Sequence, residues 1–350
     1  MTIASHQAKK FRSHALIIGA GALGSAVGLR LQEAGTALTF LAKREHAERL
    51  SRPQFFHHEP DSRGSALSDF DVIYDLNEAS PNEIDWVILA LNGAILKSSE
   101  GRDLLAGLGA HFADSEATLL LCSVGLGLIE FVQQASQWSP ERCIQGTLAH
   151  YVYQTHMSDG NNTDKRTVDY RSFKLPGAPS FILSDQPEKA SAKFQALYDD
   201  SPQNPCARLP NDLFQLNTTL FLPHMLVCDI AGWPASDELV KMPDLWSLYC
   251  EASREIMSLP IFGASGESML QNGSNDELAA QLLARTEALK PFDIDAFNRF
   301  HHGGKMKAQN ELMFADCIEH ALKQGIKMPS CQQLRDQIKT NPEQTTEITQ

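Results

Sequence analysis

Three glycines near the start of the sequence have the spacing of a phosphate-binding turn. Gly19, Gly21 and Gly24 form a Gly-x-Gly-x-x-Gly pattern directly after the apolar run 15–18. In such a turn the first glycine permits a tight bend, the second lets backbone N–H groups approach a diphosphate, and the third lets the following helix pack closely. A helix N-terminus also attracts anions. We predict dinucleotide binding, with the diphosphate held by Gly19, Gly21, Ala22, Leu23 and Gly24. The alternative is a turn whose glycines serve packing alone.

Two cations follow the next predicted strand, which spans residues 37–41. The chain continues as Ala42, Lys43 and Arg44, and the first carboxylate is Glu45. Enzymes that use NAD usually place an acidic residue here, where it holds the 2′-hydroxyl of the ribose, whereas cations suit the 2′-phosphate of NADP. Lys43 and Arg44 therefore favour NADP(H) over NAD(H). The alternative is that both side chains are merely solvated at the end of a strand.

These motifs require a particular arrangement of elements. A strand, a glycine turn, a helix over 25–34 and a second strand form a βαβ unit, which implies a parallel sheet with right-handed crossovers. Later apolar runs lack polar alternation, as is typical of strands covered by helices on both faces. Further predicted strands lie at 85–91 and 118–123, with 71–74 as a weaker candidate; predicted helices span 96–110 and 128–136, and segments 143–154 and 172–184 are rich in β character.

The second half of the chain has a different character. From residue 212 onward the apolar spacing is mostly helical, and the clearest helices span 306–323 and 330–338. We therefore predict an α/β fold in which an N-terminal Rossmann-like, doubly wound parallel sheet precedes an all-helical C-terminal domain. The predicted boundaries are 1–207 for the NADP-binding domain, 208–340 for the helical substrate and dimerisation domain, and 341–350 for a disordered tail.

The composition limits the partners. The 350 residues include 30 basic and 43 acidic side chains, which gives a net charge of −13 and opposes binding to nucleic acid or anionic lipid. The apolar runs are too short to span a membrane, and the first residues lack the apolar core of a signal peptide. Seven cysteines without a CxxC pair indicate reduced thiols. We expect a cytoplasmic protein with a small-molecule substrate, and the helical faces make a homodimer possible.

The sequence resembles the ketopantoate reductase (2-dehydropantoate 2-reductase) family. The resemblance is carried by LIIGAGALGSAVGLRLQEAG at 16–35 and LTFLAKREHAERL at 38–50, and more weakly by segments 85–91, 124–127, 292–298 and 325–329. It implies that Lys43 stands where the family binds the 2′-phosphate of NADP(H). We also predict that Leu91, Asn92 and Gly125 bind the cofactor, with Asn92 and Gly125 on the nicotinamide side. The implied reaction is the NADPH-dependent reduction of a 2-oxo acid to a 2-hydroxy acid, and pantothenate biosynthesis is a possible context.

The chain departs from the family at the residues that carry its chemistry. The family has a lysine after the fourth strand, where this chain has Asn92, and an asparagine where this chain has Val124. Its catalytic lysine lies early in the second domain, yet residues 212–229 contain no lysine and offer Gln215, Asn217 and His224 instead. For the substrate-binding serine of the family, Ser268 is the available candidate.

Reduction of a 2-oxo acid needs a hydride, a proton donor at the carbonyl oxygen and a group that binds the carboxylate. Histidine is a common donor because its ordinary pKa lies near working pH. His224 follows Asn217 by seven residues, so the two would share a helix face if the helix continues through Pro223. Asp293 is the candidate for the family's glutamate. We predict His224, Asn217 and Asp293 as catalytic residues; the alternative for His224 is a core histidine.

Other polar clusters give weaker predictions. The segment His301-His302-Gly303-Gly304-Lys305-Met306-Lys307 could bind an anion, although a solvated loop before the next helix is the simpler interpretation. No metal-ligand spacing or hydrolase motif is present in the sequence. The preferred hypothesis is an NADP-dependent oxidoreductase. The alternatives are a catalytically silent NADP(H)-binding sensor or scaffold, and an opine-type imine reductase.

Overall fold

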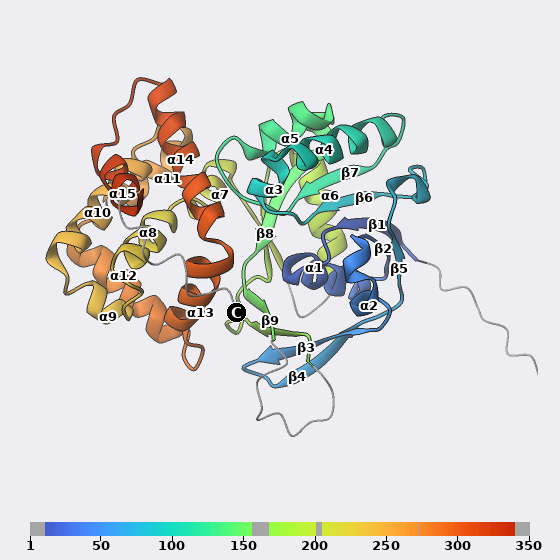
Figure 1. The fold of residues 1–350 in the computed structure, drawn as a ribbon, viewed down its shortest axis with the longest axis horizontal. Helices are drawn as coiled ribbons and strands as arrows, with labels where there is room; N and C mark the ends of the chain where they lie inside the picture. The colour runs from blue at the N-terminus through green and yellow to red at the C-terminus, as the bar shows by residue number, and fades with distance from the viewer. Residues whose placement is uncertain (1–10, 156–167, 201–204, 272, 340–350) are drawn as a thin grey trace, which may run out of the picture.

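The computed structural model describes residues 11–155, 168–200, 205–271 and 273–339 (Figure 1). The N-terminal half forms a large sheet with helices on both faces, and the C-terminal half is a group of helices at its side. The predicted α/β fold class, with a Rossmann-like domain and a helical C-terminal region, is confirmed. The boundary at 207/208 stays a prediction, and the predicted tail at 341–350 lies outside the described residues.

The large sheet contains eight strands in the order β12-β11-β8-β7-β6-β1-β2-β5. Six of them, from β5 to β8 across the sheet, run parallel, while β11 is antiparallel to β8 and parallel to β12. The strands are β1 (Ser13–Ile18), β2 (Thr36–Leu41), β5 (Phe70–Ile73), β6 (Trp86–Leu89), β7 (Thr118–Leu121), β8 (Cys143–Leu148), β11 (Phe181–Ser184) and β12 (Cys206–Leu209).

The strand order reverses between β1 and β6. From β1 the chain continues to β2 and β5 on one side, and then returns to β6, β7 and β8 on the other. In the register, Ile18 at the end of β1 pairs with both Leu41 and Leu89. The loops that follow these three strands therefore leave the sheet at the same edge. In open α/β sheets this reversal point is the usual ligand-binding position.

Helices cover both faces of the sheet, as a doubly wound fold requires. Helices α1 (Ala22–Glu33) and α6 (Glu188–Asp199) share one apolar core with β1 and β6, whereas α4 (Ser99–His111) and α5 (Leu128–Ser136) pack on the opposite face. The helix predicted over 96–110 is divided, because the Ser98 side chain caps α4 and so separates it from α3 (Gly93–Lys97). Short helical turns follow β2 and β5: η1 (Arg44–His46), α2 (Ala47–Leu50) and η2 (Leu76–Glu78).

A second, four-stranded sheet lies over the α1 face and was not predicted. Its order is β4-β3-β10-β9, with strands β3 (Gln54–Glu59), β4 (Arg63–Leu67), β9 (Tyr151–Gln154) and β10 (Tyr170–Phe173). The parallel pairing of β3 with β10 joins segments more than 100 residues apart. No local pattern reveals such a pairing, because the strands are adjacent only after the chain has folded.

The C-terminal region is helical throughout its described residues. Its core is formed mainly by α8, α10, α14 and α15. The helices are α7 (Asn211–Asn217), α8 (Leu222–Ile230), α9 (Ser236–Leu239), α10 (Pro243–Met257), α11 (Gly263–Gln271), α12 (Asn275–Ala288), α13 (Ile294–Phe300), α14 (Lys307–Lys323) and α15 (Pro329–Lys339); a π-helical turn, η5 (His301–Lys305), joins α13 to α14. Within the described ranges, no helix is both long enough and apolar enough to cross a membrane.

Two of the contacts between the two halves lie at α3 and on the four-stranded sheet (Figure 1). Helix α14 packs beside α3, where Lys97 and Asp316 form an ion pair. In the second place, Phe292 stacks on Tyr151 of β9 and on Phe173 of β10, with ring centroids 4.9 and 4.8 Å apart. The small sheet therefore serves as part of the contact surface for the helical region.

Candidate functional site

The glycine turn has the tight geometry that the sequence predicts. Gly19 has a φ of +104°, and a Cβ atom there would lie 2.8 Å from the Ala90 carbonyl oxygen. A Cβ atom on Gly24 would lie only 1.9 Å from the Gly19 carbonyl oxygen. Around Gly21, in contrast, no atom lies within 4 Å of a Cβ position. Two glycines thus allow close packing, and the third faces open space.

The N-terminus of α1 is suited to an anion. Gly21 is the N-cap and has no side chain that could accept the first amide hydrogens, and the first turn, from Ala22, contains no acidic residue. Leu23 is half-buried, and the turn lies where the strand order reverses. The free N–H groups of a helix start need acceptors. The turn therefore fits the diphosphate of a dinucleotide, and its predicted role in binding stays a prediction.

Lys43 and Arg44 lie at the same edge, after β2. Both are exposed, and the Arg44 guanidinium lies over the Tyr74 ring, 5.0 Å from its centroid. Tyr74 directly follows β5, the neighbour of β2 in the sheet. The pKa of Glu100 is lowered mainly by hydrogen bonds at the start of α4, and the charge of Lys43 contributes. Two cations and an aromatic ring thus lie together beside the glycine turn.

Of the three residues predicted to bind the cofactor after β6 and β7, Asn92 and Gly125 contact other parts of the protein. The Asn92 side-chain oxygen accepts from the Ile95 N–H at 2.8 Å and so caps α3. Leu91 is half-buried. Gly125, with a φ of +141°, is buried, and its Cβ position lies 3.5 Å from Cγ of Met313 in α14. Contact of these residues with a nicotinamide stays a prediction.

Buried glutamines connect the two halves beside this edge. The Gln309 side chain, 4% exposed, accepts from the Ala94 N–H at 2.7 Å. Gln215, 6% exposed, donates to Oε1 of Gln145 at 3.0 Å, and Gln145 donates to the Ser123 carbonyl at 2.9 Å. Oε1 of Gln215 is buried without a hydrogen-bond partner among the described residues. The sequence did not indicate Gln309 and Gln145, because a single glutamine in a helix or strand forms no motif.

The expected helix through Asn217 and His224 does not form, so the prediction that they share one helix face was wrong. Helix α7 ends at Asn217, and α8 begins at Leu222, immediately before Pro223. Proline suits the first turn of a helix and is unfavourable in its interior. Asn217 is exposed, whereas the His224 ring lies 6.0 Å from the Tyr249 ring.

The environment of His224 also alters the chemistry expected of it. Burial lowers its pKa from 6.5 to about 4, with further contributions from nearby charged groups. The imidazole is therefore neutral at neutral pH, and the argument from an ordinary histidine pKa does not apply. His224 thus resembles the core histidine of the alternative interpretation.

Asp293 has a structural partner. It is exposed, and its carboxylate accepts from the Ala296 N–H at 2.9 Å as the N-cap of α13. No hydrogen bond or ion pair joins any two of Asp293, Asn217 and His224, all of which are among the described residues. Their catalytic roles stay predictions, and the described contacts give them no common centre.

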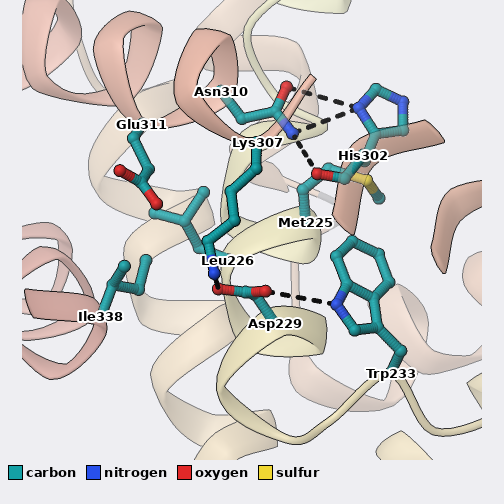
Figure 2. A pocket seen from close by; sticks show the side chains of 9 residues that line it. All are labelled: Met225, Leu226, Asp229, Trp233, His302, Lys307, Asn310, Glu311 and Ile338. Atoms are coloured by element: carbon teal, nitrogen blue, oxygen red, sulfur yellow. Dashed lines mark hydrogen bonds and ion pairs between the residues drawn. The ribbon is translucent and has the colours of Figure 1, made fainter. Parts of the chain in front are cut away.

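The segment from His301 to Lys307 forms a π-helical turn and the start of α14, so the interpretation as a solvated loop was wrong. Figure 2 shows the small cavity that it lines with α8 and α15. Lys307 forms an ion pair with Asp229 at 2.9 Å, and Asp229 accepts from the Trp233 ring N–H at 3.2 Å. The cavity, of about 10 Å³, has room for roughly one water molecule.

One of the two glycines of this segment, Gly303, serves packing, whereas no atom lies within 4 Å of a Cβ position on Gly304. A Cβ atom on Gly303 would lie 2.7 Å from the Trp233 ring. Burial lowers the pKa of both His301 and His302 to about 4. Among the described residues, no group of three or more His, Cys, Asp or Glu side chains could hold a metal ion.

The fold is Rossmann-like in its N-terminal half, with a glycine turn after the first strand, and helical in its second half. Residues 15–171 match the family model described as ketopantoate reductase PanE/ApbA. The resemblance to the ketopantoate reductase family is thereby confirmed over the N-terminal domain. No curated protein matches the chain in sequence.

Solved structures share the fold over nearly the whole chain. A 2-dehydropantoate 2-reductase from Geobacter metallireducens GS-15 is 17% identical, with a TM-score of 0.67 and coverage of 93% of this chain and 99% of that one. D-Mandelate dehydrogenase, solved with NADH and anilino(oxo)acetate, is 14% identical, with a TM-score of 0.64 and coverage of 93% and 97%. The dimeric ketopantoate reductase from Staphylococcus aureus is 12% identical, with a TM-score of 0.59 and coverage of 93% and 98%.

Proposed function

We propose that the protein is an NADP(H)-dependent oxidoreductase of the ketopantoate reductase type, which reduces a small 2-oxo acid to the 2-hydroxy acid. The observation that carries the proposal is the open glycine turn at the reversal point of the sheet, with Lys43 and Arg44 beside it. The family match to residues 15–171 supports the reaction class. D-Mandelate dehydrogenase, with its bound anilino(oxo)acetate, supports a 2-oxo acid substrate.

Different residues of the chain bind different parts of the cofactor. The amide hydrogens at the start of α1 hold the diphosphate, and Lys43 and Arg44 hold the 2′-phosphate. Arg44 is oriented for this contact because its guanidinium lies over the Tyr74 ring. When bound, the cofactor supplies the hydride. In this proposal the nicotinamide lies toward the loops after β6 and β7, which contain Asn92 and Gly125.

A titration calorimetry experiment tests the cofactor. The wild type is expected to bind NADPH more tightly than NADH. The double variant Lys43→Ala, Arg44→Ala is expected to lose that preference. Its affinity for NADPH falls about tenfold, while its affinity for NADH does not change. An unchanged ratio would refute the assignment of the two cations. Absence of binding for both nucleotides would refute the proposed function.

A second function, a catalytically silent NADP(H)-binding sensor or scaffold, is favoured by one observation. The side chains that join the two halves beside the glycine turn include two buried glutamines, Gln309 and Gln215, which offer no ionisable proton. Absorbance assays of NADPH with a panel of 2-oxo acids distinguish the two functions. Turnover supports the reductase, and tight NADPH binding without turnover supports the silent protein. Repeating the assay with an added amine tests the opine-type imine reductase.

The remaining expectations concern the setting of the protein. We propose a homodimer, which the dimeric Staphylococcus aureus reductase supports as a precedent for the fold. Light scattering of the purified protein tests it. A cytoplasmic location, and the absence of nucleic-acid and membrane partners, stay predictions from the net charge of −13 and the reduced thiols.

A further inference from the structure

A third cation, Arg49 of α2, lies at the glycine turn. Its Nη2 donates to the Ala20 carbonyl at 2.6 Å, and its Nη1 donates to the Tyr170 hydroxyl and, at 3.4 Å, to Oε1 of Gln54. All three acceptors are neutral, and Arg49 has no ion pair with any described residue. A half-buried guanidinium without a counter-charge is unusual, because desolvated charges are normally paired.

The surroundings hold this side chain in one place. Tyr170, which is fully buried, comes from β10 of the small sheet, and its hydroxyl also accepts from Oγ of Ser25 in α1 at 3.1 Å. Gln54 of β3 donates back to the Arg49 carbonyl. The small sheet thus positions Arg49 against the turn. A side chain fixed before a ligand arrives loses less conformational entropy on binding.

We infer that Arg49 binds the diphosphate of the dinucleotide, which is the part common to NADP(H) and NAD(H). Ala20, to which it is hydrogen-bonded, directly precedes Gly21, where the turn is open. A guanidinium has five N–H donors, and the three contacts above leave two for phosphate oxygens. This inference rests on the proposed function and extends it. Lys43 and Arg44 bind the 2′-phosphate and so favour NADP(H), whereas Arg49 strengthens the binding of NADP(H) and NAD(H) equally.

Two fragment ligands separate these roles. ADP-ribose carries the diphosphate without a 2′-phosphate, and adenosine 2′-monophosphate carries the 2′-phosphate without a diphosphate. Dissociation constants of both fragments, and of NADP(H) and NAD(H), are measured for the wild type, Arg49→Gln and the Lys43→Ala, Arg44→Ala double variant. Arg52→Gln is the matched control, because Arg52 is a cation of the same segment that is paired with Asp169 at 2.6 Å.

The expected result is that each variant weakens the binding of a different fragment. Arg49→Gln weakens ADP-ribose, NADP(H) and NAD(H) by the same factor, about tenfold or more, since a hydrogen bond to a charged group is lost. It leaves adenosine 2′-monophosphate and the ratio of NADP(H) to NAD(H) affinities unchanged. The double variant lowers that ratio and the affinity for adenosine 2′-monophosphate. Arg49→Gln also reduces the salt dependence of ADP-ribose binding, whereas Arg52→Gln leaves ADP-ribose affinity unchanged.

Three results would overturn the inference. Unchanged ADP-ribose affinity in Arg49→Gln would make Arg49 a structural residue only. Equal weakening of both fragments would indicate a general distortion of the site. A change in the ratio of NADP(H) to NAD(H) affinities would assign Arg49 to the 2′-phosphate. If the wild type binds neither dinucleotide, the proposed function fails, and this inference fails with it.

Thermal unfolding without ligand shows whether the variants fold. If Arg49→Gln does not fold, Arg49→Lys takes its place, because lysine keeps the charge and loses the forked geometry. Arg49→Lys is expected to weaken ADP-ribose and not adenosine 2′-monophosphate. An unchanged ADP-ribose affinity in this variant would contradict the forked contact with the diphosphate.

Discussion

The carboxyl edge of the large sheet and the junction with the helical region lie side by side and differ in chemistry. At the edge, Gly21 faces open space, and the exposed cations Lys43 and Arg44 lie beside it. At the junction, Gln309 and Gln215 are buried and neutral, and they form hydrogen bonds across the two halves. The edge is open and positively charged, whereas the junction is closed by buried hydrogen bonds between neutral groups.

Cofactor binding and proton transfer constrain a sequence in different ways. Binding a diphosphate needs backbone N–H groups and small residues in a fixed order, so the turn retains a recognisable spacing. Proton transfer needs one side chain with a suitable pKa at one point in space. At the junction, the buried Gln309 and Gln215 are amides that cannot titrate, and Lys97 is paired with Asp316. This difference is why cofactor binding is the stronger part of the proposed function.

The largest expected effect comes from Gly24→Ala. Its Cβ atom would lie 1.9 Å from the Gly19 carbonyl oxygen, so the turn must move, which destabilises the fold by about 3 kcal/mol. Gly21→Ala is the matched control, because no atom lies within 4 Å of its Cβ position. That variant is expected to unfold at the wild-type temperature and to bind NADPH about tenfold more weakly, since its methyl group lies where the diphosphate would approach.

Thermal unfolding and calorimetry check both glycine variants. Equal stability of the two variants would contradict the packing role of Gly24. Wild-type NADPH affinity in Gly21→Ala would mean that the diphosphate does not bind at Gly21. The open edge would then have no assigned role in cofactor binding.

A smaller effect is expected at the junction. Gln309→Leu removes the acceptor of the Ala94 N–H and leaves a buried donor unpaired, which destabilises the protein by about 2 kcal/mol. Urea unfolding measures the change. Gln333→Leu, at an exposed glutamine of α15, is the control and is expected to stay within about 0.5 kcal/mol of the wild type. A stable Gln309→Leu variant with weakened NADPH binding would instead assign this glutamine to the ligand.

The smallest effect concerns pH. His224 has a folded pKa of about 4, below the value of 6.5 in an unfolded chain. Between these values the unfolded state binds the proton and the folded state does not, so stability falls as the pH is lowered from 6.5 toward 4. At pH 6 the loss due to this one ring is about 1 kcal/mol. Replacement by phenylalanine is expected to reduce the slope of stability against pH in this range.

Urea unfolding at several pH values checks the slope. An identical slope in His224→Phe would mean that the ring takes up its proton as readily in the folded protein as in the unfolded one. His224 would then again be a candidate proton donor, and the contrast between the edge and the junction would weaken.

The sequence predicted individual helices of both halves closely, but not every junction between helices and not the pairing of distant strands. Helix α5 (Leu128–Ser136) matches its predicted range, and α14 (Lys307–Lys323) begins one residue after its predicted start. The prediction of one helix that runs from Asn217 through Pro223 was wrong, because a sequence does not distinguish a proline at the start of a helix from one in its interior. The small sheet was missed, because β3 and β10 become neighbours only through tertiary contacts.

The sequence by itself determined the Rossmann-like domain and the position of its glycine turn, because strand and helix periods and glycine spacing are local properties of a chain. Only the tertiary structure decided which polar side chains meet. It buried Gln309 against α3, placed His224 near Tyr249 and brought Tyr170 to Arg49. These contacts join segments distant along the chain, and their free energies depend on burial and hydrogen-bond geometry that no local pattern contains.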